Sequence, residues 1–263
     1  MRKRSASSFK LAKIVALIAA IISLWEIAGR LLPFLRFLIS TPAEVIFYSS
    51  LRYEELLAAM ITTGTESIFG LAFAFGFALA AIIAGLYWDT FYRWILPAAI
   101  VSQVIPLVSL APFFILVFGL GLQGKVAMAA TMCFFPIFVN FSAGVLGVPQ
   151  QTKDLLFIYA FSRTQSIFRV YLPLSVPHIF AGLRIAATLA VIGAIVAEFN
   201  GADRGLGKNL FLAAKRLEPE LMIASLVLSS FLGGTFYWLL NKIERRIGYW
   251  YVPNQVFGIE DKL

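Results

Sequence analysis

Long runs of hydrophobic residues, separated by short polar segments, dominate this sequence. The runs cover about residues 14–25, 57–87, 95–118, 125–147, 179–199 and 221–241. A helix of about 20 apolar residues crosses the hydrocarbon core of a bilayer, and most of these runs reach that length. Three prolines interrupt the third run, namely Pro97, Pro106 and Pro112. The pattern predicts an all-α, polytopic membrane protein with about six transmembrane helices in a single domain over residues 1–263.

The N-terminal run permits two interpretations. A basic start, Arg2 to Arg4, precedes the apolar residues Ile14 to Trp25, which is also how a secretory signal peptide begins. No cleavage site made of small residues follows before Glu26, so we favour an uncleaved first span.

Composition and charge agree with a membrane protein. The chain is 60% hydrophobic and only 14% charged, whereas an average soluble domain has about 25% charged residues. We assign the net charge of +8 to the ends and connecting segments, where Lys and Arg orient a chain in the membrane. The distribution of these residues favours both termini in the cytoplasm and places residues 151–178 there. Nucleic-acid binding need not be invoked.

The sequence offers little for catalysis or metal binding. Cys133 and His178 are the only residues of their types, which excludes an intrachain disulfide and leaves no cluster of zinc-type ligands. Residues 119–126 match the pattern G-x-x-x-x-G-K of a phosphate-binding loop, but Val126 stands where Ser or Thr would bind Mg²⁺. Apolar runs also flank this stretch on both sides, so we interpret it as a turn. We therefore expect no enzyme activity and no cofactor or metal on this chain.

One long segment mixes polar and apolar residues between two hydrophobic runs. From Gln151 to about Arg169, charged and polar residues alternate with Leu, Ile, Phe and Tyr. This spacing predicts an amphipathic helix or a bent pair of short helices. We expect Leu172-Pro173 to end the helix, because proline lacks an amide donor and restricts the preceding residue. A charged helix held at the membrane surface suits the docking of a soluble partner.

A few polar residues lie within the apolar runs, where they are candidates for function. Four of them could line a translocation path or form interhelical hydrogen bonds, namely Ser102, Gln103, Ser109 and Asn140. Glu198 ends the fifth run, and we favour a role as an outer gate or loop anchor over that of a buried proton carrier. An ion-coupled secondary transporter is the alternative class, and it would need acidic residues well inside the spans. Glu66 is the one residue arguably placed that way.

The segment from Asp154 to Arg184 resembles the cytoplasmic "EAA" loop of the permeases of ABC importers. In that loop, E-A-A-x-x-x-G precedes Leu-Pro. Aligned on Leu172-Pro173, Asp154 stands at the Glu position, Leu155 and Leu156 at the two Ala positions, and Ala160 at the Gly position. Residues 40–45, 105–140 and 172–207 are similar to the branch that imports nitrate, sulfonates, taurine, thiamine pyrimidines and riboflavin. The resemblance covers about residues 38–240.

This resemblance implies a type I importer fold and a mechanism. Two permeases would act together, and we expect them to be a homodimer. Each would place a coupling helix, within residues 151–171, on one subunit of a cytoplasmic ATPase dimer. ATP and Mg²⁺ would bind that ATPase, while an extracytoplasmic solute-binding protein would deliver the solute to this chain in the cytoplasmic membrane. By position, the implied coupling residues are Asp154, Leu155, Ala160, Phe161, Ser162 and Arg163. Asp is shorter than Glu and leucines replace alanines, so the helix could require a matched ATPase.

The resemblance and the composition constrain the solute weakly. Residues 125–140 look more similar to the thiamine-precursor and riboflavin permeases than to the nitrate permeases. A path with many aromatic residues and few buried cations also suits a heteroaromatic ring better than a small oxyanion, which would favour Arg or helix N-termini. We expect a heteroaromatic vitamin or precursor, with an alkanesulfonate, taurine or nitrate as the alternative.

Overall fold

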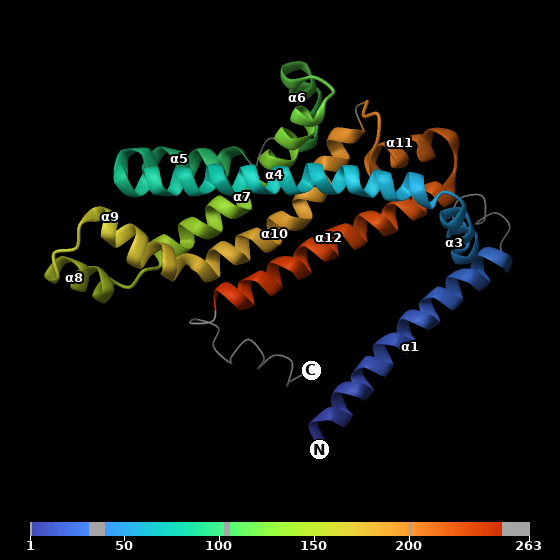
Figure 1. Ribbon diagram of the computed structural model, residues 1–263, viewed down its shortest axis with the longest axis horizontal. Helices are drawn as coiled ribbons and strands as arrows, with labels where there is room; N and C mark the ends of the chain where they lie inside the picture. The colour runs from blue at the N-terminus through green and yellow to red at the C-terminus, as the bar shows by residue number, and fades with distance from the viewer. Residues whose placement is uncertain (1, 32–39, 103–105, 200, 249–263) are drawn as a thin grey trace.

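A computed structural model describes residues 2–31, 40–102, 106–199 and 201–248 (Figure 1). Every regular element in these ranges is helical, which confirms the all-α fold. The elements are α1 Arg2–Leu31, α3 Pro42–Leu51, α4 Tyr53–Tyr87, α5 Asp89–Ser102, η1 Leu107–Leu110, α6 Ala111–Phe118, α7 Leu122–Leu146, α8 Gln150–Ile158, α9 Arg163–Ser166, η2 Ile167–Tyr171, α10 Leu172–Glu198, α11 Leu206–Arg216 and α12 Pro219–Ile247.

Four helical stretches of the described chain are long and apolar enough to cross a membrane. They are Tyr53–Tyr87, Leu122–Leu146, Arg163–Glu198 and Pro219–Ile247, and they contain the predicted second, fourth, fifth and sixth runs almost entirely. The first predicted run lies within α1. The third, predicted as one span over 95–118, is instead divided between α5 and the pair η1–α6. Pro97 is accommodated inside α5, whereas Pro106 and Pro112 lie at the starts of η1 and α6.

The prediction that Leu172-Pro173 ends a helix is wrong. Helix continues from Arg163 to Glu198 through a π-helical turn, η2, and Pro173 lies in the first turn of α10. The amide of Leu172 donates to the carbonyl of Ile167, five residues earlier, as in a π-helix. This shifted hydrogen-bonding pattern joins α9 to α10 directly before a residue that has no amide to donate.

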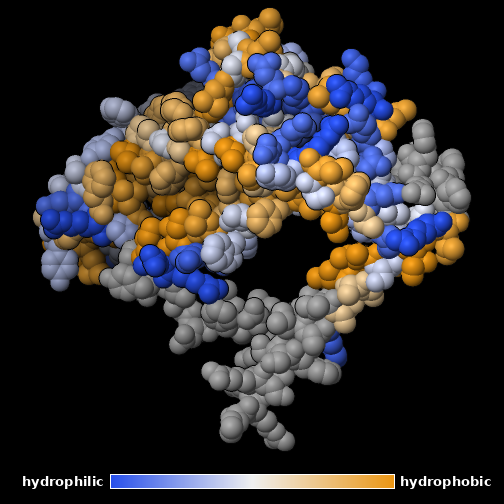
Figure 2. Space-filling view, turned by 45° about the vertical axis from the view of Figure 1, so that its right-hand side comes forward, coloured by the Kyte–Doolittle hydropathy of each residue, from blue (hydrophilic) through white to orange (hydrophobic). Residues whose placement is uncertain are grey.

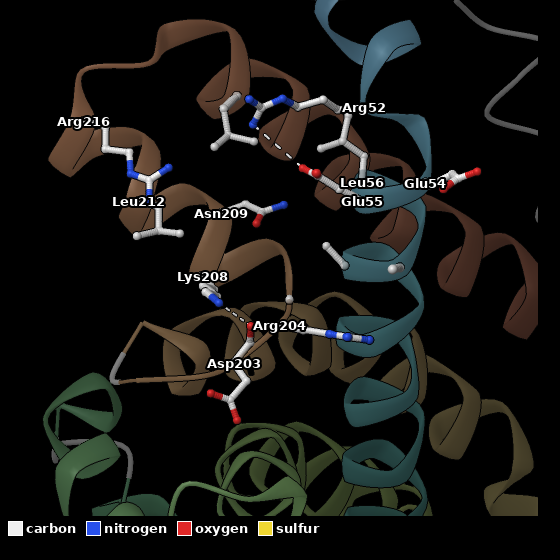
Figure 3. A pocket seen from close by; sticks show the side chains of 14 residues that line it. Arg52, Glu54, Glu55, Leu56, Asp203, Arg204, Lys208, Asn209, Leu212 and Arg216 are labelled. Atoms are coloured by element: carbon white, nitrogen blue, oxygen red, sulfur yellow. Dashed lines mark hydrogen bonds and ion pairs between the residues drawn. The ribbon is translucent and has the colours of Figure 1, made fainter.

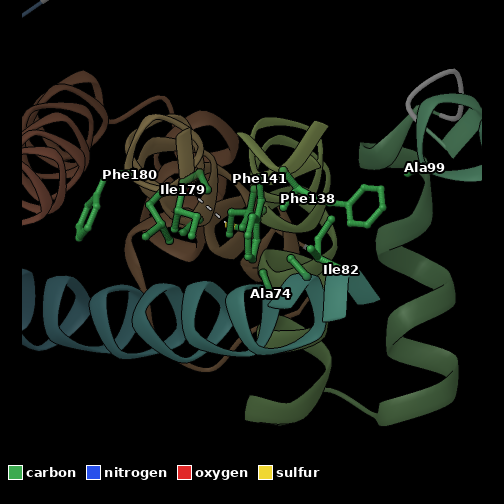
Figure 4. Packing of buried hydrophobic residues seen from close by; sticks show 14 residues of the cluster. Ala74, Ile82, Ala99, Phe138, Phe141, Ile179 and Phe180 are labelled. Atoms are coloured by element: carbon green, nitrogen blue, oxygen red, sulfur yellow. Dashed lines mark hydrogen bonds between the residues drawn. The ribbon is translucent and has the colours of Figure 1, made fainter. Parts of the chain in front are cut away.

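Helices α4, α7 and α10 form the centre of the bundle and pack against one another along much of their length. Their shared core contains the fully buried side chains Ile82, Phe138 and Phe141, with Ile179 almost fully buried beside them (Figure 4). Small residues allow the close approach: a β-carbon at Gly70 would lie 2.5 Å from that of Ala129. Helix packing through glycine and alanine is common inside membranes.

We expect Gly70→Ala to weaken this bundle. The new methyl group would meet the β-carbon of Ala129 at 2.5 Å and the backbone nitrogen of Ala130 at 3.1 Å, so α4 and α7 must separate. Such overpacking typically costs about 1–3 kcal/mol. Gly76→Ala is the matched control on the same helix, because nothing lies within 4 Å of its added β-carbon. In detergent, the midpoint of thermal unfolding should fall for Gly70→Ala and stay unchanged for Gly76→Ala. Equal midpoints for the two variants would contradict the close packing of α4 against α7.

The bundle has two polar ends. Helices α8 and α9 lie at one end of the long axis, and α3 and α11 lie towards the other (Figure 1). Hydrophobic residues cover much of the left half of the face shown in Figure 2, and hydrophilic residues gather at its left edge and over its upper right part. Helix α4 runs from one end to the other. Under the predicted orientation the α8–α9 end is cytoplasmic, and we refer to the opposite end as the outer end.

An ion pair connects two spans inside the bundle. Arg184 of α10 donates to Glu244 of α12, and both side chains are largely removed from solvent. The pair joins α10 to α12.

Candidate functional sites

The predicted docking segment is a bent pair of short helices, α8 and α9. Helix α8 ends in a Schellman motif: the amide of Phe161 donates to the carbonyl of Leu156 at 3.0 Å, and that of Ala160 donates to Phe157 at 3.0 Å. Ala160 has a φ of 48°, in the left-handed region that this position requires and that favours glycine. The geometry explains why the EAA pattern has glycine where this chain has Ala160.

Ser162 starts the second helix of the segment. Its hydroxyl accepts from the amide of Gln165 at 3.2 Å, while its own amide donates to the Gln165 side chain at 2.9 Å. This reciprocal capping box satisfies two donors that a helix N-terminus would otherwise leave free. Ser162 therefore fixes the bend between α8 and α9.

Side chains of α9 attach the segment to the C-terminal end of α4. The Nε of Arg163 donates to the carbonyl of Leu86 at 2.8 Å, and the Thr164 hydroxyl lies 2.8 Å from that of Tyr87. A cation at the C-terminus of a helix also interacts favourably with the helix dipole. Arg163 thus links the docking segment to the longest helix of the bundle.

The tip of α8 exposes a group of large apolar side chains. Phe157 is 88% exposed, Ile158 72% and Tyr159 71%, and Leu155 is half exposed. An exposed apolar patch with polar surroundings is typical of a protein interface. Asp154, which accepts from Gln150 at 2.9 Å, and Phe161 lie beside this tip along the chain. Phe157, Ile158 and Tyr159 are absent from the set predicted by sequence, although their position at the end of an amphipathic helix was a usable signal.

We expect Ala160→Gly to stabilise the docking segment. An L-residue in the left-handed conformation costs about 1–2 kcal/mol, and glycine removes this cost at the expense of greater freedom in the unfolded chain. Amide hydrogen exchange over residues 156–162 should become slower. Ala214→Gly, an exposed position inside α11, is the matched control and should instead lose about 0.5–1 kcal/mol. Faster exchange in Ala160→Gly would show that the left-handed backbone of Ala160 is not strained.

Glu198 anchors a loop at the outer end of the bundle. It is 1% exposed, its Oε1 accepts from the Thr63 hydroxyl at 2.7 Å, and its Oε2 accepts from the amide of Gly207 at 2.5 Å. The loop wraps closely around the carboxylate, because a β-carbon at Gly205 would lie about 2.1 Å from Oε1, and Gly205 has a φ of 135°. Glu198 thereby connects α10 to α4 and to the start of α11.

A buried ion pair adjoins this anchor. Lys125, near the start of α7, donates to Oε1 of Glu66 on α4 at 2.9 Å. Glu66 is 1% exposed, its carboxyl group faces that of Glu198, and its Oε2 has no hydrogen-bond partner among the described residues. We refer to Thr63, Glu66, Lys125 and Glu198 as the outer polar cluster. The cluster joins α4, α7, α10 and α11, and the roles of Thr63 and Lys125 in it are absent from the sequence predictions.

The four residues predicted for a translocation path are placed unevenly. Ser102 ends α5 and Ser109 lies exposed in η1, while Gln103 falls outside the described residues. Asn140 lies in the interior of α7, where its amide group donates to the carbonyl of Pro136 at 2.8 Å. A path role for these residues stays a prediction.

Two further features concern phosphate and metal binding. Residues 119–121 form the connection between α6 and α7, and Gly119 has a φ of 77°, so the predicted turn is present but short, since residues 122–126 already belong to α7. The described residues hold no group of three or more His, Cys, Asp or Glu placed to bind a metal ion.

Comparison with known proteins places the chain in a family. Residues 76–249 match the family model described as "Binding-protein-dependent transport system inner membrane component". The chain is 30% identical to a formylaminopyrimidine transport permease of Halalkalibacterium halodurans, over 86% of this chain and 91% of that one. It is 33% identical to a riboflavin transport system permease of Chloroflexus aurantiacus, over 60% of each chain. A putative aliphatic sulfonates transport permease of Bacillus subtilis is 26% identical, over 88% of this chain and 85% of that one.

The match covers more than half of the chain and includes the docking segment, α10 and α12. It confirms the resemblance noted from the sequence and sets aside the ion-coupled secondary transporter. A permease of this kind is not itself catalytic, and the family implies an ATPase and a solute-binding protein as partners. The chain belongs to the binding-protein-dependent inner-membrane permeases of ABC transport systems.

Proposed function

We propose that this permease imports a small heteroaromatic solute of the vitamin or vitamin-precursor type. The observation that carries the proposal is the 30% identity to a formylaminopyrimidine permease along 91% of that protein. Similarity to a riboflavin permease supports the same chemical class. The relative named for aliphatic sulfonates, which aligns over 85% of its length, keeps alkanesulfonate, taurine or nitrate as the second candidate.

An aromatic surface on α4 supports this choice of solute. Phe69, Phe73 and Phe77 follow one another at four-residue spacing and line a shallow, open apolar hollow beside Gly76. Phenylalanine faces can stack on a planar ring. A sulfonate or nitrate would instead favour a guanidinium or a helix N-terminus.

The α8–α9 segment, in this proposal, is the coupling element that docks on the ATPase. The apolar tip of α8 contacts the partner together with Asp154, Leu155 and Phe161, because these side chains project from a bend that the Ala160 and Ser162 geometry fixes. Arg163 acts as a positioning residue that holds the segment against α4. ATP and Mg²⁺ bind on the ATPase, and two copies of this permease each contribute one coupling segment.

Movement then passes along α4 to the outer polar cluster. The helix continues without interruption from Tyr87, which contacts Thr164, to Thr63, which contacts Glu198. A rigid helix of this kind can transmit a rocking motion between the two ends of a permease. In this mechanism Glu198 is the outer gate, since releasing it frees the loop over residues 201–207.

The experiment that tests the solute uses the permease reconstituted with its ATPase and the solute-binding protein of the same transport system. ATPase activity is measured with formylaminopyrimidine, riboflavin, an alkanesulfonate, taurine and nitrate in turn. We expect only the heteroaromatic solutes to stimulate activity. Stimulation by a sulfonate, taurine or nitrate alone would support the ABC mechanism and show that the proposed solute class is wrong. If no ATPase associates with the permease, the coupling assignment fails as well.

A further inference from the structure

A polar cavity lies at the outer end of the bundle, apart from the aromatic hollow. It has a volume of about 450 Å³ and opens between the first turns of α4, the loop before α11, and α11 itself (Figure 3). Gly205 contributes to its wall and also packs against the carboxylate of Glu198. Anything that binds in this cavity therefore contacts the loop that Glu198 anchors.

Positive charges outnumber negative charges around this cavity. Its cationic lining residues are Arg52, Arg204, Lys208 and Arg216, and its acidic ones are Glu54, Glu55 and Asp203. Arg52 pairs with Glu55 at 3.8 Å, Arg216 pairs with Glu218 at 3.9 Å, and Lys208 donates to the backbone carbonyl of Asp203. Figure 3 shows the Glu54 and Asp203 carboxylates directed away from the centre of the group.

Arg204 is the strongest available anchor for an anion. Its side chain is exposed and extends towards α4, and no hydrogen bond or ion pair involves its guanidinium among the described residues (Figure 3). The Asn209 amide group and the Lys208 ammonium lie on the same wall, on the first turns of α11. A guanidinium with neighbouring donors binds a carboxylate through two parallel hydrogen bonds.

We propose that this cavity receives a carboxylate side chain of the solute-binding protein, with Arg204 as its anchor. The inference rests on the proposed function, because it names where the extracytoplasmic partner binds. A heteroaromatic solute would gain little from the Arg204 guanidinium and the Lys208 ammonium beside it, whereas a carboxylate on a protein surface is complementary to them. A partner bound here contacts the loop over 203–207, which Glu198 holds in place. Binding of the loaded partner can therefore change the hydrogen bonds of Glu198.

The test compares Arg204→Glu with Lys215→Glu in the complete permease–ATPase complex held in nanodiscs. Lys215 is exposed on α11, the helix that follows the Arg204 loop, and lies outside the lining of the cavity, so the control makes an equal charge change. Affinity for the solute-binding protein and basal ATPase activity are measured at low and high salt. We expect Arg204→Glu to weaken binding at least about tenfold at low salt, and stimulation by the binding protein to be lost, whereas Lys215→Glu should keep both.

A charge exchange makes the test specific. Each surface Asp and Glu of the binding protein is replaced by Lys in turn, and we expect one of these variants to restore binding to Arg204→Glu. Equal affinity of Arg204→Glu and Lys215→Glu would overturn the inference. So would a normal affinity for the binding protein combined with altered transport of an anionic solute, because the cavity would then be a solute site. Absence of any ATPase stimulation by the loaded binding protein in the native complex would instead contradict the proposed function.

Discussion

Phe157→Asp is expected to separate this permease from its ATPase. Phe157 is 88% exposed at the tip of α8, the largest exposed fraction in the apolar group there. A carboxylate at the centre of an apolar contact must lose its hydration without gaining a partner, which costs several kcal/mol. Loss of one central aromatic anchor alone typically costs at least about 2 kcal/mol in binding. Co-purification of the ATPase and solute uptake should both fall by at least about 100-fold.

Two variants separate this effect from unfolding and from charge. Phe157→Leu keeps an apolar side chain at the tip and should retain most of the assembly. Gln151→Asp adds the same negative charge to an exposed position at the other end of α8, and should leave the ATPase bound. If Phe157→Asp assembles as well as Gln151→Asp does, the tip does not contact the ATPase. A normal thermal unfolding midpoint for Phe157→Asp would show that only docking has changed.

Much of the architecture could be predicted because lipid imposes simple constraints on sequence. Long apolar runs indicate spanning helices, since backbone polar groups inside a bilayer must be satisfied within the helix. The segment from Gln151 to Arg169 broke that pattern and predicted a surface element, which the structure shows as α8 and α9. Local chemistry likewise explained Ala160, because a helix C-terminus of this type requires a left-handed residue.

The remaining features depended on contacts that the local pattern does not contain. Pro173 is compatible with a continuous helix only because η2 shifts the hydrogen bonds before it, and a single sequence gives no sign of that turn. Lys125 follows a glycine-rich turn and resembles a loop cation, yet its partner Glu66 lies 59 residues away on α4. Arg163 had the character of a surface contact, whereas the end of α4, 77 residues earlier, supplies its acceptor.

Lys125→Met is expected to destabilise the outer end more than any other single change considered above. Lys125 is the cation that pairs with Glu66, which is 1% exposed and faces a second carboxyl group on Glu198. Removing one partner of a buried ion pair leaves an uncompensated charge and typically costs about 3–5 kcal/mol. The unfolding midpoint in detergent should fall sharply, and uptake should fall with it, because α4 and α7 lose their polar link.

The double variant Glu66→Met, Lys125→Met tests whether the lost stability comes from the unpaired charge of Glu66 or from the missing Lys125 side chain. Replacing both members of a buried pair by apolar residues of similar volume is often neutral or stabilising, so the double variant should recover most of the lost stability. Lys215→Met, an exposed cation on α11, should change the midpoint little. Recovered stability without recovered uptake would show that the outer end must hold a charged link that can open and close. Failure of the double variant to recover any stability would show that the Lys125 side chain stabilises α7 by packing, not by pairing with Glu66.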